Sequence, residues 1–418
     1  MRSLTILLAT TLFLASCSDG PGSGDGVNAT TLEPTLEELY RVGTVEGTGW
    51  EAFAQIRSVA FDAHGRLYIL DSGQHHVVVL DTDGSFLRTI GSRGEGPEEL
   101  RSPFAMTVLG TGEVAIYDMG HQSFLVFSAD GEFRRSVRAG FEEGIPGARI
   151  SPHGASGVVS VSRNMVMMTR GGGAPTPPTT APIRRFDLSG QGEGEVLHEA
   201  WIPARESSTA SAEVRVGGGG GARIQGPGIR AFEPQVHLAA LPDGHMVVAD
   251  TSSYRLLLLD AEGNEVKVVE HAVTPTPVGE AERRAERERR LVALQEGAGP
   301  QISMAGGGGA PMPIDQDAVR EMFRGQIETM EFWHEIPVIA ELATDAAGRI
   351  WLGRSGGVNR PGPIDILSPE GELLGTLDAG QGPIPDAFGP DGRAAWIETD
   401  DLDVPYVRVR RIEGLPGG

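Results

Sequence analysis

The chain has 418 residues and a formal net charge of −22, with 35 Lys and Arg residues against 57 Asp and Glu residues. This charge argues against nucleic acid as a partner, because such binding depends on Lys and Arg side chains that neutralise phosphates. It argues equally against electrostatic docking on an anionic membrane surface. The length exceeds that of a usual domain, but propellers and barrels often form one large domain, and we expect a monomer.

The first residues indicate export from a bacterial cell. Arg2 precedes a short apolar run from Leu4 to Ala15, and Leu14-Ala15-Ser16-Cys17 follows the pattern of a lipobox. Small residues before a cysteine suit cleavage, so residues 1–16 are interpreted as a signal peptide. A membrane-spanning helix needs about 20 apolar residues, and this run offers only about 12.

Cys17 is the only cysteine, so the folded body has no disulfide, thiolate metal site or cysteine nucleophile. The lipobox resembles that of bacterial lipoproteins, which implies that Cys17 carries a diacylglycerol. Residues 17–35 are rich in Gly, Ser, Asp, Asn and Thr and predict a flexible tether. We therefore expect a protein of the cell envelope, on the periplasmic side or the cell surface, which touches the membrane only through its lipid.

A turn followed by a strand recurs along the rest of the chain. The segment from Phe61 to Ile69 has an Asp-x-x-Gly turn before alternating strand residues, and five later copies centre on Gly112, Gly157, Gly244, Gly348 and Gly392. The copy at Gly157 is degenerate. A second turn follows inside most units, and the same spacing of 19 residues separates Gly65 from Gly84, Gly112 from Gly131, and Gly244 from Gly263. Glycine supplies the positive φ that such hairpin turns need.

Each unit thus predicts four strands, A to D, at a period of about 45 residues, which is typical of a β-propeller. Apolar runs such as Val77–Leu80 and Leu256–Leu259 fit inner strands that are buried on both faces. The last unit supplies only three strands and ends near Ile412. We expect the orphan strand Leu39–Thr44 to complete that sixth blade and close the ring, because closure leaves no open edge. The predicted fold class is all-β, a six-bladed β-propeller over residues 36–418.

The sequence resembles the NHL/TolB-like six-bladed propellers. The resemblance is carried by Leu70-Asp71-Ser72-Gly73, by Ile90-Gly91-Ser92-Arg93-Gly94-Glu95-Gly96-Pro97, and by Asp250-Thr251-Ser252-Ser253-Tyr254-Arg255-Leu256. The last of these is close to the family pattern Asp-x-x-Asn-x-Arg-hydrophobe, although the asparagine is absent. The resemblance is specific for fold and weak for function, because such propellers serve as lyases, lactonases, sensors and scaffolds.

Four insertions interrupt the repeat, at residues 164–180, 205–231, 275–335 and 355–363. The first and last fall between strands B and C, and the other two connect strand D of one blade to strand A of the next. Both kinds of loop emerge on one face of a propeller, which we call the loop-rich face. Loops carry function disproportionately, so we place any ligand, either an envelope protein or a small molecule, on this face.

The longest insertion, residues 275–335, predicts two helices. Glu280–Gln295 interleaves Glu and Arg and is interpreted as a solvated helix held by ion pairs four residues apart. Asp315 is a plausible N-cap for a second helix. An apolar stripe at helical spacing follows it and is expected to pack on the propeller rim, formed by Val319, Met322, Phe323, Ile327 and Met330.

The sequence contains no Gly-x-Ser-x-Gly elbow, phosphate loop or His-Glu-x-x-His motif. Polar candidates for the loop-rich face are Asp71, His75, His76, Asp118, His121, Asp250, Tyr254 and Arg255. A ring of such Asp and His groups could hold Ca²⁺ or Zn²⁺. We favour the simpler interpretation that an Asp repeated in each blade bonds loop backbone amides, and we expect no cofactor.

These features predict a non-catalytic, ligand- or protein-binding scaffold of the cell envelope. The alternative is a metal-assisted lyase or lactonase that acts at the mouth of the propeller channel. The resemblance allows this alternative, since NHL-type amidating lyases hold metal in the channel, but their ligand set has no counterpart that we can match in this sequence. The missing catalytic motifs favour the scaffold.

Overall fold

The computed structural model describes residues 29–417, except 46, 48, 141–143, 164–177, 191–193, 206–208, 217–219, 297–303, 306–310, 313–315 and 359. The predicted signal peptide, the lipidation site Cys17 and the proposed N-cap Asp315 lie outside the described residues. Within the described part of the chain, no helix is both long enough and apolar enough to span a membrane.

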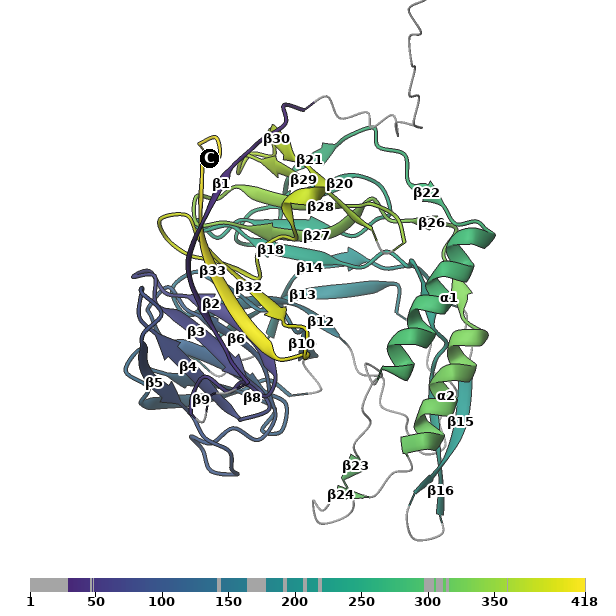
Figure 1. Ribbon diagram of the computed structural model, residues 1–418, viewed down its shortest axis with the longest axis horizontal. Helices are drawn as coiled ribbons and strands as arrows, with labels where there is room; N and C mark the ends of the chain where they lie inside the picture. Colours follow the sequence, from purple (N-terminus) through teal and green to yellow (C-terminus); the bar gives the residue numbers. More distant parts are fainter. Residues whose placement is uncertain are drawn as a thin grey trace, which may run out of the picture.

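Six antiparallel sheets form the blades of a β-propeller, as the repeat predicts (Figure 1). Blade one contains β2 (Ile56–Phe61), β3 (Leu67–Asp71), β4 (His76–Leu80) and β5 (Phe86–Ile90). Blade two contains β6 (Pro103–Val108), β7 (Val114–Asp118), β8 (Ser123–Phe127) and β9 (Phe133–Arg138). In blade three the first strand is split, so the blade contains β10 (Ile145–Pro146), β11 (Ser151–His153), β12 (Gly157–Arg163), β13 (Thr180–Asp187) and β14 (Gly194–Trp201).

The last three blades follow the same order. Blade four contains β18 (His237–Ala240), β19 (Met246–Ala249), β20 (Arg255–Leu259) and β21 (Glu265–Glu270). Blade five contains β27 (Ile339–Thr344), β28 (Ile350–Ser355), β29 (Pro361–Leu367) and β30 (Leu373–Leu377), followed by the short 3₁₀ helix η1 (Ala379–Gln381). Blade six contains β31 (Ala387–Phe388), β32 (Arg393–Thr399), β33 (Pro405–Glu413) and, from the other end of the chain, β1 (Thr35–Val42).

Glycine makes the predicted turns possible. Gly65 and Gly84 in blade one have φ of +81° and +85°, in the left-handed region that residues with a Cβ rarely adopt. The degenerate third unit departs from the prediction. There Gly154 takes the positive φ, +62°, whereas Gly157 lies at the start of β12. The turn therefore comes three residues earlier than the repeat suggests, because His153 pairs with Gly157 across it.

The core consists of six apolar clusters, and each one joins two neighbouring blades. The inner strands supply most of it: the side chains of Val77–Leu80 are fully buried, as expected for strands covered on both faces. Blades one and six share one cluster, to which Val78 and Val407 belong. The clusters thus run around the whole ring without a break.

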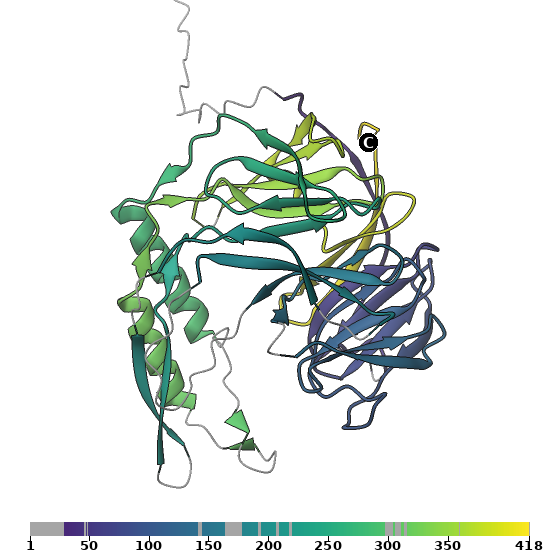
Figure 2. The ribbon, with the colours of Figure 1, turned by 180° about the vertical axis from the view of Figure 1, so that it is seen from behind.

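The ring closes through β1, which pairs antiparallel with β33 from Thr35 opposite Glu413 to Val42 opposite Val407. Both views show β1 running beside β33 (Figures 1 and 2). This confirms the predicted closure by an N-terminal strand. The expected tether, residues 17–35, ends earlier than predicted, because Leu32 packs against the cluster between blades five and six. The amide of Leu32 also donates to the carbonyl of Thr376 at 2.8 Å.

Two of the insertions combine into one structure, which we call the insertion lobe (residues 205–231 and 275–335). It contains the hairpin β15 (Thr209–Val216) and β16 (Gly220–Pro227), and the helices α1 (Glu280–Gln295) and α2 (Gln316–Glu328). Its short strands are β17 (Arg230–Ala231), β22 (Thr276–Pro277), β23 (Met304–Ala305), β24 (Pro311–Met312), β25 (Glu331–Phe332) and β26 (Glu335–Ile336). The two helices lie side by side at one edge of the molecule, with the hairpin beside α2 (Figures 1 and 2).

The apolar stripe of α2 does not pack on the propeller rim, contrary to the prediction. Ile327 and Met330 are buried instead in a small cluster within the insertion lobe, together with Leu294 of α1 and Ala231 of β17. The reason is that α1 has an apolar side of its own, which the interleaved Glu and Arg residues obscure in the sequence. The lobe therefore has a core separate from the six clusters of the ring.

Candidate functional site

The three loop aspartates that the sequence singles out have structural roles. Asp71 is completely buried at the end of β3. Its carboxylate accepts four backbone hydrogen bonds at 2.8–3.1 Å, from the amides of Ala54, Gln55, Gly73 and Gln74. Asp118 in blade two accepts three in the same way, from Arg101, Ser102 and His121. The preferred interpretation, an Asp that bonds loop amides in successive blades, is confirmed for these residues.

Asp250, Tyr254 and Arg255 likewise contact the protein itself. Asp250 accepts a hydrogen bond from the amide of Trp201 at 2.8 Å and lies 3.7 Å from the guanidinium of Arg255. Tyr254 is buried, with its ring edge-on to His271 at 4.8 Å between centroids, and burial raises the pKa of its phenol. A buried tyrosine cannot contact a ligand in this conformation.

His75 and His121 lie in the B–C loops of blades one and two, and His76 is the first residue of β4. Nδ1 of His75 lies 3.1 Å from the carbonyl oxygen of Leu100, and Nδ1 of His121 lies 3.2 Å from Asp118. Burial lowers the pKa of His76 and favours its neutral form. Among the described residues, no three His, Cys, Asp or Glu side chains are grouped so that they could hold a metal ion.

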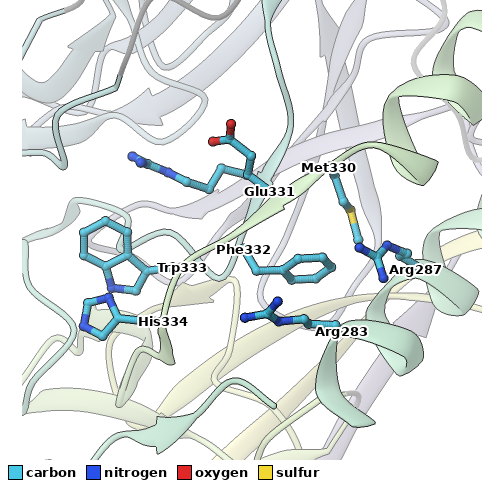
Figure 3. Close-up of a pocket in the computed structure, with 8 residues that line it drawn as sticks. Arg283, Arg287, Met330, Glu331, Phe332, Trp333 and His334 are labelled. Atoms are coloured by element: carbon cyan, nitrogen blue, oxygen red, sulfur yellow. The ribbon is translucent and has the colours of Figure 1, made fainter. Parts of the chain in front are cut away.

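A pocket of about 490 Å³ opens in the insertion lobe, beside α1 (Figure 3). The segment after α2 forms one wall, because β25 pairs in parallel with β17. The amide of Trp333 then donates to the carbonyl of Ala231 at 2.9 Å and extends this pairing. The pocket is lined by Arg230, Arg283, Arg287, Met330, Glu331, Phe332, Trp333 and His334.

Two guanidinium groups of α1 stack against one aromatic ring of the pocket. Arg283 and Arg287 are four residues apart, so they lie on the same side of the helix. Their guanidinium carbons are 5.7 and 4.8 Å from the centroid of the Phe332 ring. Figure 3 shows both groups beside that ring. At these distances the cation–π attraction holds the two charges in place against the pocket wall.

The third pocket arginine is held differently. Arg230 forms an ion pair with the buried carboxylate of Glu233, which Arg205 also contacts. The guanidinium carbon of Arg230 lies 5.1 Å from the centroid of the Trp333 ring. Arg230 thus shares a carboxylate partner with Arg205, whereas Arg283 and Arg287 have no close carboxylate partner among the described residues.

Elsewhere on α1, two arginines share one glutamate as ion-pair partner. Glu286 is buried and forms ion pairs with Arg289 and Arg290 at 2.7 and 2.6 Å. Burial alone would raise the pKa of Glu286, but the hydrogen bonds from both arginines outweigh it and hold that pKa below its ordinary value. The expectation of ion pairs four residues apart is confirmed for Glu286 with Arg290, whereas the pairs of Arg289 with Glu286 and of Arg283 with Glu280 are three residues apart.

Sequence reasoning placed the ligand on the loop-rich face but missed the residues that line this pocket. The Glu-Arg alternation of residues 280–290 masks which arginines have partners. One signal was present, since Arg287 has Arg283, Arg284 and Arg290 as its neighbours three and four positions away. These like-charged neighbours at helical spacing distinguish Arg287 from the arginines of the same helix that form close ion pairs.

Comparison with known proteins supports the fold. Residues 51–143, which span blades one and two, match the DUF5128 family model, described as a 6-bladed beta-propeller. No curated protein matches the chain.

Solved structures resemble the chain at low sequence identity. One is a protein of Bacteroides fragilis named as exported, with 10% identity, a TM-score of 0.48, and coverage of 94% of this chain and 98% of that one. Another is a virginiamycin B lyase from Staphylococcus aureus, with 9% identity, a TM-score of 0.40, and coverage of 92% and 89%. A third is a gluconolactonase from Xanthomonas campestris, with 11% identity, a TM-score of 0.37, and coverage of 94% and 98%. At these values the names describe those proteins and not this chain.

Proposed function

We propose that this protein is a monomeric, non-catalytic binding protein of the bacterial cell envelope, and that the insertion lobe carries its binding site. The observation that carries the proposal is the lobe itself. Two insertions far apart in the sequence meet there through β17 and β25 and form a separate core and a pocket. Among the described residues, none of the six clusters that join the blades includes a residue of the lobe.

The aspartates of the loop-rich face support the same proposal. Asp71 and Asp118 are fully buried, and their oxygens already accept backbone hydrogen bonds. A carboxylate engaged in this way has less capacity to bind a metal or to accept a proton from a substrate. His75, His76 and His121 remain candidates on that face for the alternative, a metal-assisted lyase or lactonase.

Anchoring at Cys17 is part of the proposal and can be tested separately. A diacylglycerol on Cys17 would hold the protein on a membrane while the propeller faces the aqueous compartment. Replacing Cys17→Ser is expected to release the protein into the soluble fraction. A variant that stays uncleaved in the membrane would show that an apolar helix is the anchor instead.

The binding function is tested by replacing Pro275–Glu335 with a short Gly-Ser linker. The variant should keep a cooperative unfolding transition and lose its cross-linked partners in whole cells, as measured by quantitative mass spectrometry. A matched double variant, His75→Ala with His121→Ala, should keep those partners. The proposal is wrong if the purified protein contains a stoichiometric transition metal and turns over a lactone or cleaves a peptide lactone, with that activity lost in the histidine variant.

A further inference from the structure

We propose that the pocket between α1 and residues 330–334 binds a small organic anion, which carries a carboxylate or phosphate group next to an apolar part. This inference rests on the proposed binding function and names the chemistry of the ligand. It is carried by the two arginines that stack on Phe332 and by the lack of a close carboxylate beside them among the described residues.

Arg283 and Arg287 have no close carboxylate partner among the described residues. Arg287 forms no ion pair with any carboxylate among the described residues, and Arg283 has only a long contact of 3.6 Å to the exposed Glu280. The Nε atoms of both arginines are buried, so a ligand in the pocket would meet the terminal nitrogens of the guanidinium groups. These nitrogens can donate charge-assisted hydrogen bonds to the oxygens of an anion.

The one acidic residue that lines the pocket does not supply this anion. Glu331 is exposed, and Figure 3 shows its carboxylate pointing away from Arg283 and Arg287. Neighbouring residues of a strand such as β25 point to opposite sides, so Glu331 faces away from Phe332. The two guanidinium groups therefore form a local positive site in a chain whose formal net charge is −22.

The size and the remaining walls of the pocket favour a small molecule with an apolar part. A volume of about 490 Å³ lies within the usual range for small-ligand sites. Met330, Phe332 and Trp333 contribute apolar atoms to the lining of the pocket. Planar guanidinium groups held by a ring suit the planar carboxylate or the oxygens of a phosphate, both of which arginine can bind in a bidentate way.

Isothermal titration of the full chain in nonionic detergent tests the inference with benzoate and phenyl phosphate as probes. At least one of these should bind with saturation, and benzamide, the uncharged analogue of benzoate, should bind at least tenfold more weakly. Arg287→Gln should weaken binding of the anionic probe at least tenfold. Arg287→Lys keeps the charge but loses the planar group, so it should weaken binding to a lesser extent.

Arg284→Gln is the matched control, because Arg284 is exposed on the same helix, carries the same charge and does not line the pocket. It should change the affinity by less than twofold. Circular dichroism should show that all three variants keep the wild-type helix content. The inference is overturned if neither anion binds, if benzamide binds as tightly as benzoate, or if Arg287→Gln binds like Arg284→Gln.

Failure of this inference can be told apart from failure of the proposed function. If the linker variant loses its partners while Arg287→Gln keeps them and neither anion binds, the binding function stands and the ligand class is wrong. If an anion binds and depends on Arg287 while the linker variant keeps all partners, the pocket stands and the lobe is not the partner-binding surface.

Discussion

Asp71 in the ring and Arg287 in the insertion lobe are both charged, but they differ in burial and in the partners of their charges. Asp71 is fully buried and accepts four backbone hydrogen bonds. Arg287 is half-buried, stacks on a ring and has no carboxylate partner in the described part of the chain. A buried charge without partners is costly, so an uncompensated charge is tolerated where solvent reaches it. In the ring, the charge of Asp71 stabilises the fold through backbone hydrogen bonds. In the lobe, the charge of Arg287 is accessible to a ligand.

The apolar cores of the two regions also differ, because the core of the ring is shared between blades and the core of the lobe is separate. The ring distributes its core over six clusters, each shared by two blades, so damage to one blade is felt by its neighbours. In the part of the lobe that the structure describes, one cluster with four buried members forms the core. We therefore expect mutations in the ring to act on the whole fold, whereas mutations in the lobe act locally.

Removal of β1 should have the largest effect on the ring. Deleting residues 18–42 removes Leu32, Leu39, Tyr40 and Val42 from two inter-blade clusters and opens an edge on β33. We expect a loss on the order of 5 kcal/mol in the free energy of unfolding, from the buried apolar area. Urea denaturation measures it, with a deletion of residues 18–28 as the control. Equal midpoints for the two truncations would contradict closure by β1.

A cavity in the ring should cost more than a similar cavity in the lobe. Leu256 is fully buried between blades four and five, and Leu256→Ala should reduce the free energy of unfolding by about 2–5 kcal/mol. Leu294→Ala in the lobe should shift the main unfolding transition by less than about 1 kcal/mol and should increase hydrogen exchange only in α1 and α2. Similar shifts of the main transition in both variants would show that the lobe and the ring unfold as one unit.

Asp71→Asn should separate a structural role from a binding role. The amide group of asparagine cannot accept all four backbone hydrogen bonds, and amides left without an acceptor cost about 1–3 kcal/mol in stability. Anion binding to the lobe should be unchanged. Asp83→Asn, in an exposed turn of the same blade, is the control and should change stability by less than about 0.5 kcal/mol. A full loss of ligand with unchanged stability in Asp71→Asn would refute the structural role.

His237 should make the ring less stable in acid. Burial, aided by the positive charge of Arg149, lowers its pKa from 6.5 to about 4 in the folded protein. Between these values the unfolded chain binds more protons than the folded one, so the free energy of unfolding falls as pH drops through this window. We expect His237→Asn to reduce the loss between about pH 7 and pH 5 by on the order of 1 kcal/mol.

Urea titrations of wild type and His237→Asn at both pH values measure this difference. Burial raises the pKa of Asp365 and Asp386, which contributes with the opposite sign, since a raised carboxyl pKa favours the folded state only at low pH. Both aspartates are present in both proteins, so their contribution cancels. Parallel pH profiles for the two proteins would rule out His237 as the titrating group.

Arg287→Gln should have the smallest effect on stability, and of opposite sign. Arg283, Arg284 and Arg290 lie three or four positions away, and each such like-charged pair costs about 0.2–0.5 kcal/mol. Removing the charge should stabilise the lobe by a few tenths of a kcal/mol, detectable as slower hydrogen exchange in α1. Arg284 lies four positions from both Glu280 and Glu288, so Arg284→Gln removes an attractive charge spacing and should have the reverse effect. Destabilisation by Arg287→Gln would mean that its contact with Phe332 matters more than the repulsion.

The ring can be predicted from the sequence because each blade repeats the same pattern of strands and turns. Turn glycines, apolar inner strands and an orphan N-terminal strand are periodic signals that support one another. Prediction failed where the repeat ends. The partners of Ile327 and Met330 depend on how two distant insertions meet, which no local pattern records. For the same reason the pocket residues were missed, since Arg230, Arg283 and Trp333 come from three separate segments.

The pairing of Thr35 with Glu413 joins two strands that are synthesised at very different times. β1 leaves the ribosome first, but its partner β33 is made only after every other blade. Contacts between such distant segments are slow to form, because a very long loop must close before they can stabilise the fold. Until then both strands keep unpaired edges that invite association between chains. We therefore expect the last blade to complete folding, and newly made molecules to be prone to association until it does.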